Sequence, residues 1–240
     1  MRVACFALFS FLLLPIASFA ADAVNELTPA EKEAGWKLLF DGKSADNFRN
    51  YGKTDLNPLW KVADGALTLT GKGGGDIVAK EQYGAFELTL DYKISKGGNS
   101  GLMYHVKETD KAPYFTGPEV QIQDNVDGKD PQKAGWLYQL YPAMTDATKP
   151  AGEWNTLRIL ITPEKCEQFM NGVKYCEYVK GSKDWDEKVA KSKFAKWTGK
   201  DKESGEIVGF GKPTKGYICL QDHGNEVSFR NIKVRPIASK

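Results

Sequence analysis

The segment Phe86–Ile94 constrains the fold more than any other part of the chain, because apolar and polar residues alternate at each of its positions. Alternation of this length predicts a strand with one side in a core and the other in solvent. Similar shorter runs recur at Trp60–Val62, Ala66–Leu69, Ile77–Ala79, Leu102–Val106, Val120–Gln123, Thr156–Thr162, Cys166–Met170, Val173–Tyr178, Tyr217–Leu220 and Val227–Val234. Glycine-rich turn signals separate them, so the sequence predicts an all-β, antiparallel β-sandwich of the jelly-roll type.

Two segments depart from this pattern. Between residues 184 and 197, Trp185, Val189, Phe194 and Trp197 are spaced as on one face of an amphipathic helix, and charged residues fill the other positions. A helix packed on the sandwich explains this spacing better than a helix on a membrane surface. A single helical turn is also predicted at Thr28, in the polar lead-in to the domain. The prediction is therefore a sandwich with one or two short helices.

The N-terminus has the features of a secretory signal peptide. Arg2 precedes an apolar stretch from Val3 to Ile16, and small residues follow as far as Ala20. The stretch is short for a membrane span, which needs about 20 residues. Cleavage after residue 20 predicts a periplasmic or secreted protein, with a lead-in at 21–34 and a single domain at 35–236.

The charge and the motifs exclude several classes of function. A net charge of +2 gives no field that would favour nucleic acid or an anionic membrane. The chain has no nucleophile elbow, phosphate-binding loop or dinucleotide fingerprint. His105 and His223 are the only histidines, which excludes a centre with several histidine ligands. Any chemistry must therefore use carboxylates, amides, imidazole or arginine.

The cysteines leave two interpretations open. Cys166 and Cys176 flank a hairpin signal at Asn171-Gly172, so a cross-strand disulfide is compatible with an oxidising compartment. The alternative is two free, buried thiols. The chain has no C-x-x-C spacing, which argues against structural zinc.

The first candidate for a site is the run Glu119–Asp124. If it is a strand, Glu119, Gln121 and Gln123 share one face, and three hydrogen-bonding side chains in a row suit the hydroxyls of a sugar. An ordinary solvent-facing strand is the equally weighted alternative. The loop with Asn99 and the following Tyr104 and His105 add further candidates for substrate contacts, although a lone histidine is more often structural.

The second candidate is the polar run Gln221-Asp222-His223, which ends the apolar strand Tyr217–Leu220. An aspartate beside a histidine can orient the ring, and imidazole exchanges protons near neutral pH. Arg230 lies on what reads as the next strand and could pair with Asp222 across a hairpin. A purely structural Asp–Arg bridge is the alternative.

The chain resembles the 3-keto-disaccharide hydrolase domain family, formerly a domain of unknown function. The resemblance rests on an ordered set of motifs, none of them specific alone. They are Gly35–Lys43, Trp60, Asp64-Gly65, Asn99–Gly101, Glu119–Gln121, Asp124-Asn125, Glu153–Asn155, Asn171-Gly172, Ser192–Phe194, Gln221–Gly224 and Phe229–Ile232. The resemblance implies a concanavalin A-like jelly roll, of the lectin and glucanase type, in an exported enzyme that acts on glycosides oxidised at C3.

Such an enzyme can cleave its substrate by elimination and hydration. A ketone at C3 acidifies the proton on C2, so a base, a group that stabilises the enolate and an acid for the leaving group are required. The hypothesis assigns Glu119 or His223 as base, Arg230 or a bound divalent cation as enolate stabiliser, and Asp124 or His223 as acid. Glu119, Asp124 and His223 are the predicted ligands if a cation binds.

The chain differs from the family pattern at two places. His105 stands where the family more usually has arginine, and the connection at Gly199–Gly209 is longer and more charged than usual.

Two other functions remain open: a conventional glycosidase with two carboxylates, and a non-catalytic sugar-binding module. A secreted sandwich without activity is a third, weaker alternative.

Overall fold

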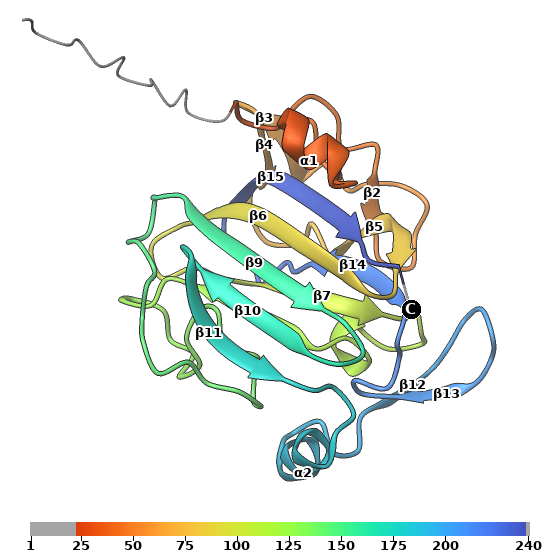
Figure 1. Cartoon of the computed structure of the whole chain (residues 1–240). Helices are drawn as coiled ribbons and strands as arrows, with labels where there is room; N and C mark the ends of the chain where they lie inside the picture. The colour runs from red at the N-terminus through yellow and green to blue at the C-terminus, as the bar shows by residue number, and fades with distance from the viewer. Residues whose placement is uncertain (1–22, 239–240) are drawn as a thin grey trace, which may run out of the picture.

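The computed structural model describes residues 23–238, so the predicted signal peptide lies outside the described residues. Two antiparallel sheets pack face to face, with the larger in front and the smaller behind it in Figure 1. The larger sheet has the order β11 (Val173–Tyr178), β10 (Cys166–Met170), β9 (Asn155–Ile161), β6 (Phe86–Ile94), β15 (Val227–Pro236), β4 (Ala66–Leu69) and β3 (Trp60–Ala63), and β1 (Lys37–Leu38) also pairs with β15. The prediction of an antiparallel sandwich is confirmed.

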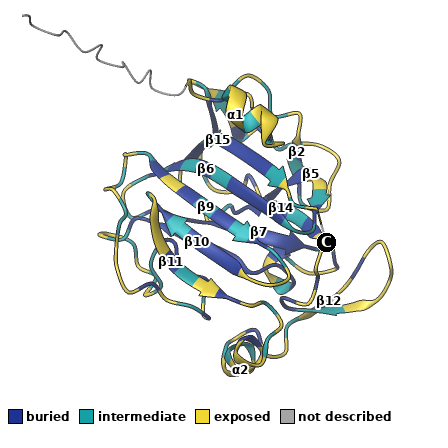
Figure 2. Ribbon diagram, viewed as in Figure 1, coloured by how far each residue is buried: buried dark blue, intermediate teal, exposed yellow. Residues whose placement is uncertain are grey.

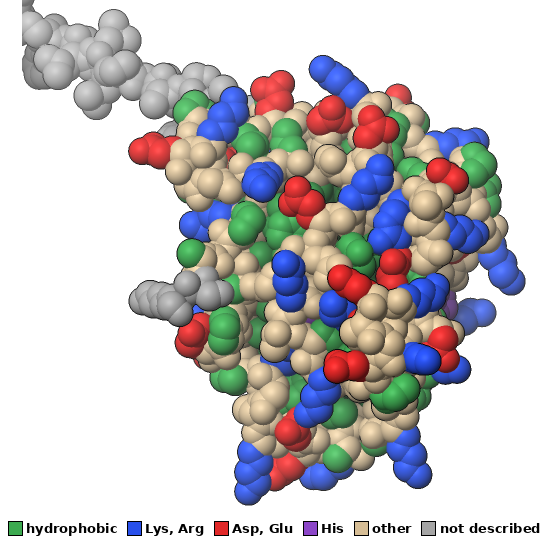
Figure 3. All heavy atoms as spheres, turned by 90° about the vertical axis from the view of Figure 1, so that its right-hand side faces the viewer, with side chains coloured by type: hydrophobic (Ala, Val, Ile, Leu, Met, Phe, Trp, Pro, Cys, Tyr) green, Lys and Arg blue, Asp and Glu red, His purple; other side chains and the backbone are tan. Residues whose placement is uncertain are grey.

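The smaller sheet carries the site described below. Its order is β2 (Phe48–Asn50), β5 (Ile77–Tyr83), β14 (Gly216–Leu220), β7 (Asn99–Val106) and β8 (Glu119–Gln123). A separate hairpin joins β12 (Thr198–Lys200) to β13 (Ile207–Gly209) and extends from the sandwich in Figure 1. On the molecular face in Figure 3, acidic and basic side chains are interspersed, which agrees with the small net charge.

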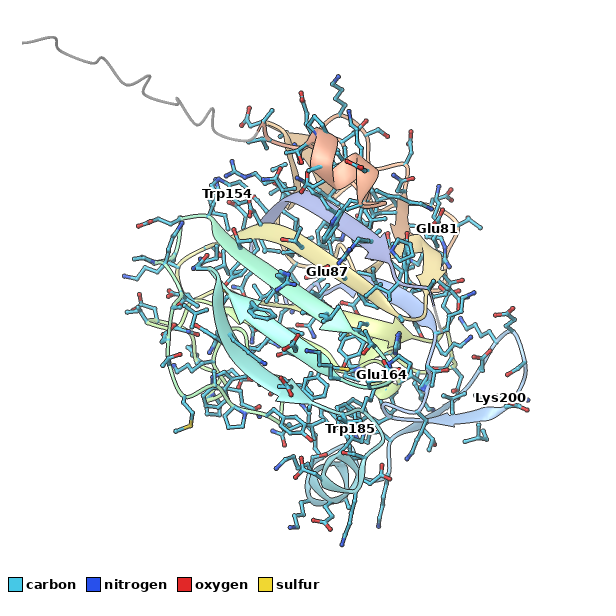
Figure 4. The ribbon with its side chains drawn as sticks, in the orientation of Figure 1. Glu81, Glu87, Trp154, Glu164, Trp185 and Lys200 are labelled. Carbon is cyan, nitrogen blue, oxygen red and sulfur yellow. The ribbon has the colours of Figure 1, made fainter. Side chains whose placement is uncertain are left out.

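The core lies between the two sheets and follows from the alternation in β6. Phe86, Leu88, Leu90 and Tyr92 point inward and have no exposed surface. Figure 2 shows buried residues alternating with intermediate and a few exposed ones along the front strands. Each large apolar side chain buried in this way contributes about 1.5–3 kcal/mol. Glu87, on the outer face in Figure 4, is paired with two arginines of neighbouring strands, which compensates its charge.

The chain crosses between the sheets several times. In particular, β14 belongs to the small sheet and β15 to the large one, so residues 221–226 form a crossing and not a hairpin. This crossing brings the polar run after β14 to the edge of the sandwich. It also separates that run from the residues of β15.

The predicted helix forms but is shorter than residues 184–197. Helix α2 spans Lys183–Lys191, with the Ser182 side chain accepting a hydrogen bond from the amide of Trp185. The helix ends at Ser192, whose hydroxyl donates to the Val189 carbonyl at 2.8 Å. Trp185 is fully buried and points from the helix toward the strands in Figure 4.

The predicted turn at Thr28 is the short helix α1 (Pro29–Glu33), and one 3-10 turn, η1, spans Pro113–Phe115. Thr28 caps α1 in a reciprocal pair of hydrogen bonds with Glu31. None of the helices found between residues 23 and 238 is long and apolar enough to cross a membrane.

Of the two interpretations that the sequence leaves open for Cys166 and Cys176, the structure shows free thiols and no disulfide. The pairing of β10 with β11 explains this. Cys166 lies opposite Tyr178, and Cys176 lies opposite Gln168, so the two cysteines are not cross-strand partners. Symmetry about the Asn171-Gly172 turn would already place Cys166 opposite Glu177, and the β-bulge between Gln168 and Phe169 moves its partner one residue further, to Tyr178.

Candidate functional site

A row of polar side chains crosses the outer face of the small sheet. Gly101 of β7 lies opposite Gln121 of β8. The carbonyl of Gly101 accepts a hydrogen bond from the backbone amide of Gln221 at 2.9 Å. Glu119 lies two residues before Gln121 and therefore on the same face. The intervening residues, such as Val120, point into the core and are fully buried. The strand alternation thus places Glu119 and Gln121 on one face, and the pairing of the neighbouring strands brings Gln221 beside them.

These residues form the floor of a pocket with a volume of about 270 Å³. Its walls come from loops far apart in the sequence and are largely aromatic. The lining residues are Asn99, Tyr114, Glu119, Gln121, Asp130, Tyr138, Lys193, Phe194, Trp197, Gln221 and His223. The volume is just below the usual range for ligand sites, about 300–1,000 Å³, and suits a single sugar ring better than a long oligosaccharide.

Glu119 is held in an unusual environment for a carboxylate. Its exposed fraction is 9 %, and its carboxylate lies over Gly101, where a Cβ atom would be only 2.4 Å from Glu119 Oε1. Burial raises the pKa of Glu119 to about 8, and the charges of Asp76 and Asp130 add to this effect. The charge of Lys193 and a hydrogen bond from the Gln221 side chain lower the pKa of Glu119, but by less than burial raises it. Near neutral pH, Glu119 can therefore either hold or accept a proton.

Several amide oxygens around Glu119 lack a hydrogen-bond partner. Within residues 23–238, the buried, unpartnered side-chain atoms include Asn99 Oδ1, Gln121 Oε1 and Gln221 Oε1, all from residues that line this pocket. A buried acceptor without a donor costs about 1–3 kcal/mol. The pocket is therefore prepared to accept hydrogen bonds from several donors of a ligand.

The walls contain a cation and aromatic rings that the sequence alone does not identify. Lys193 Nζ lies 4.3 Å from the ring centroid of Tyr138 and 5.6 Å from that of Trp197. The Tyr138 hydroxyl donates to Asp130 Oδ2 at 2.7 Å. Phe115 stacks on Trp197 with centroids 4.6 Å apart. Lys193 belongs to a motif of the resembled family, but only the folded loop shows that its ammonium group reaches the pocket.

Asp76 is a second carboxylate that the sequence does not identify. It directly follows the glycines 73–75, which read as a simple turn. Burial raises the pKa of Asp76 to about 6, and the nearby charge of Asp222 adds to this effect. Asp76 Oδ1 accepts the amide hydrogen of Asp222 at 2.9 Å. Asp76 therefore carries a charge at pH 7 that favours the protonated form of Glu119.

His223 and Asp222 have different positions despite being neighbours. His223 is exposed and lines both the pocket and a shallow groove formed by Lys72, Gly73, Gly75, Asp222 and Gly224. The carboxylate of Asp222 accepts the amide hydrogens of Gly73, Gly75 and Gly224. Asp222 therefore holds the glycine turn beside the pocket, whereas His223 stands at the pocket mouth.

Tyr104 and His105 do not reach this pocket. Tyr104 points into the core with Leu102, is fully buried, and its hydroxyl hydrogen-bonds to the Tyr178 hydroxyl at 2.8 Å. His105 has a positive φ of 52°, and the pairing of β7 with β14 shifts register beside it. This bulge turns the imidazole toward one end of the sandwich, where it packs against Phe86. The prediction that both residues contact the substrate is not supported by their positions.

Asp124 and Arg230 are also placed elsewhere. The Asp124 carboxylate accepts the amide hydrogens of Gly97 and Val126, so it stabilises a turn, and these bonds hold its pKa below the usual value despite desolvation. Arg230 lies in the large sheet, where it pairs with Asp91 at 3.3 Å and stacks on Trp154 at 4.1 Å. The predicted bridge between Arg230 and Asp222 is therefore wrong, because the chain crosses between sheets after β14.

The predicted set of metal ligands is not brought together. Asp124 caps its turn and does not line the pocket that contains Glu119 and His223. In the part of the chain that the structure describes, no group of three or more histidine, cysteine, aspartate or glutamate side chains is arranged to hold a metal ion.

Comparisons with known proteins agree with the fold. The chain is 32 % identical over 230 residues to the 3-keto-disaccharide hydrolase of Bacteroides thetaiotaomicron, covering 84 % of this chain and 78 % of that protein. A candidate glycosyl hydrolase of Parabacteroides distasonis has a similar crystal structure, with a TM-score of 0.78, 35 % identity and coverage of 90 % and 100 %. A second from that organism has a TM-score of 0.62, 32 % identity and coverage of 84 % and 99 %.

The model of one family matches nearly the whole described domain. The match extends over residues 35–235, which includes both sheets and every residue that lines the pocket. Together with the similarity to the Bacteroides protein, it shows that this chain belongs to the family of the 3-keto-alpha-glucoside-1,2-lyase-like domain.

Proposed function

We propose that this protein is an exported carbohydrate-active hydrolase that cleaves 3-keto-glycosides, with the pocket around Glu119 as its active site. The observation that carries the proposal is the floor of the pocket. Three unpartnered amide oxygens surround a buried carboxylate that can exchange a proton near neutral pH. Family membership supports the substrate class, and the N-terminal segment supports export.

The pocket has the features needed to bind one oxidised sugar ring. The amide oxygens of Asn99, Gln121 and Gln221 accept hydrogen bonds from sugar hydroxyls. The partly exposed Trp197 offers an apolar face to the ring. Each of these oxygens has less than 1 Å² of exposed surface, so the three side chains turn toward the sugar when it binds.

The cleavage proceeds by elimination followed by hydration. Glu119 removes the C2 proton, and the electron pair moves into an enolate whose oxygen is stabilised by the ammonium group of Lys193. The enolate re-forms the ketone as the C1–O bond breaks, and His223 protonates the departing oxygen. Water then adds its hydroxyl to C1 and its proton to C2. The net reaction is hydrolysis of the glycosidic bond.

The positions of the two proton-transfer groups support this division of roles. Glu119 is at the floor, where a raised pKa makes its ionised form a stronger base than an exposed glutamate. His223 is at the mouth, beside the shallow groove, where a leaving group can enter solvent. An imidazole can donate a proton at neutral pH.

The substrate test compares oxidised with unoxidised sugars. The protein is purified from the periplasmic fraction of an expressing bacterium. N-terminal sequencing of this purified protein is expected to show that it begins at Ala21.

The purified protein is incubated with 3-keto-trehalose and with trehalose, and the released sugars are quantified. We expect turnover of the keto sugar only. Equal turnover of both sugars would assign a conventional glycosidase, and binding without turnover would assign a sugar-binding module.

A further inference from the structure

A second cavity lies at the end of the sandwich to which the bulge in β7 directs His105. Its volume is about 160 Å³. It is lined by Gly84, Ala85, His105, Ile161, Thr162, Pro163, Lys180 and Thr214. Glu164, labelled in Figure 4, follows directly after this lining and belongs to a wider groove that shares Ala85, Thr162 and Pro163 with the cavity. Asn99 of the first pocket and His105 are six residues apart on β7, or roughly 20 Å along the strand.

The hydrogen bonds of His105 fix its protonation. Nε2 lies 2.8 Å from the Gly84 carbonyl, which can only accept, so this nitrogen carries the hydrogen. Nδ1 therefore has a free lone pair, and it accepts a hydrogen bond from Lys180 Nζ at 2.8 Å. Burial, together with the Lys180 charge, lowers the pKa of His105 to about 3. His105 is thus a neutral acceptor that orients Lys180.

Lys180 is a partly buried cation for which residues 23–238 supply no counter-charge. It donates to His105 and to the Pro213 carbonyl, which leaves one of its three ammonium hydrogens for the cavity. Among the described residues no carboxylate forms an ion pair with Lys180, whereas nearby Lys212 is paired with Asp186 at 3.0 Å. Other groups that face Lys180 are the Cys166 thiol and the ring of Tyr104. A partly buried cation is stabilised by a counter-charge, and the described residues supply none to Lys180, so this arrangement favours an anion from outside the chain.

The cavity walls indicate the kind of anion. Apart from Lys180, His105 and the two threonines, the lining is apolar and includes Ala85, Ile161 and Pro163. We propose that this cavity binds a small organic monocarboxylate, with its carboxylate on Lys180 and its short apolar part against these walls. The site is separate from the sugar pocket and shares no lining residue with it.

Calorimetric titration of the full-length mature protein tests this site with butyrate and, as a neutral analogue of the same shape, butyramide. We expect a Kd of about 1 mM for butyrate at pH 7 and at least tenfold weaker binding of butyramide. Desolvation lowers the pKa of Lys180 to about 8, so butyrate binding should weaken about tenfold for each pH unit above that value.

Two variants locate the bound anion. Lys180→Met is expected to weaken butyrate binding at least tenfold, whereas Lys212→Met, which removes the neighbouring charge, should change it less than twofold. Turnover of the keto sugar should be unchanged in both. Equal binding of butyramide, chloride binding as tight as butyrate, or retained affinity in Lys180→Met would each overturn the proposal. Should Lys180→Met fail to fold, the comparison of butyrate with butyramide and its pH dependence decide the matter in the wild-type protein.

Discussion

Replacing Glu119 with glutamine is expected to lower kcat/KM for a 3-keto-glycoside about 10³-fold, because the amide cannot accept the C2 proton. Glutamine has nearly the same shape, so binding of the sugar should be largely retained. Steady-state kinetics measures the loss, and calorimetry with the unprocessed substrate measures binding. The exposed Glu164 provides the matched control, since Glu164→Gln should leave the rate within twofold. Full turnover in Glu119→Gln would remove Glu119 from the mechanism.

The same substitution is expected to stabilise the protein at alkaline pH. The pKa of Glu119 is about 8 in the folded state, against 4.5 in the unfolded chain. Between these values the folded state binds more protons, so the free energy of unfolding of the wild type falls as pH rises. The variant lacks this penalty. Urea denaturation should therefore show similar stability near pH 4.5 and a gain of about 2–4 kcal/mol for Glu119→Gln at pH 9.

The pH dependence of the wild type distinguishes the two roles of Glu119. As the base, Glu119 must be ionised, whereas His223 must be protonated to act as the acid, so the test needs a substrate whose C2 proton removal limits the rate. A primary isotope effect from deuterium at C2 establishes this condition, and kcat/KM should then rise with pH and level off above an apparent pKa of about 8. A fall of kcat/KM through this range under the same condition would instead make Glu119 the acid. Unlike the loss of activity in the glutamine variant, the direction of this change reports which way the proton moves.

Replacing Gly101 with alanine is expected to reduce kcat about 100-fold while the fold is retained. The new Cβ would lie 2.4 Å from Glu119 Oε1 and 2.9 Å from its Cδ, so the carboxylate must move away. A displacement of about 1 Å in an active site can cost about 10² in rate. Because the obstructed atoms end a flexible side chain, the backbone need not shift.

Gly209→Ala is the control for this substitution, since its nearest neighbour would be Lys212 Cγ at 3.5 Å. Circular dichroism and thermal denaturation check that both variants fold. If Gly101→Ala retained more than half of the wild-type rate, the carboxylate could not be acting from its observed position. The outcome therefore tests the geometry of the site separately from the chemistry of Glu119.

The sequence determines the floor of the pocket because strand alternation is a local property. Once β8 is recognised, Val120 must face the core, so Glu119 and Gln121 must share the outer face. The walls are different. Tyr138 and Lys193 lie in loops far along the chain, and their meeting depends on the paths of those loops rather than on any local pattern.

The predictions that were wrong have specific causes. The Arg230–Asp222 pair assumed that consecutive strands form a hairpin, whereas β14 and β15 belong to different sheets. The position of His105 depends on a bulge, which shifts the register without a clear signal in the residues. Cys166 and Cys176 are offset by one residue about the Asn171-Gly172 turn, and the bulge in β10 increases this offset. The short strands β2 and β12 were not predicted, because three residues are too few to show a periodicity.

The pairing of β8 has a consequence for solubility. Residues 135–138 run along the free edge of β8 and form backbone hydrogen bonds with it. The backbone amide of Gln121 donates to the Trp136 carbonyl. The backbone amide of Gly135 donates to the Gln121 carbonyl, and that of Tyr138 donates to the Glu119 carbonyl. An uncovered edge strand invites pairing with another molecule and aggregation. The segment that supplies Tyr138 to the pocket therefore also caps the sheet. Selection against aggregation and selection for sugar chemistry must act on the same few residues, which limits how freely this loop can vary.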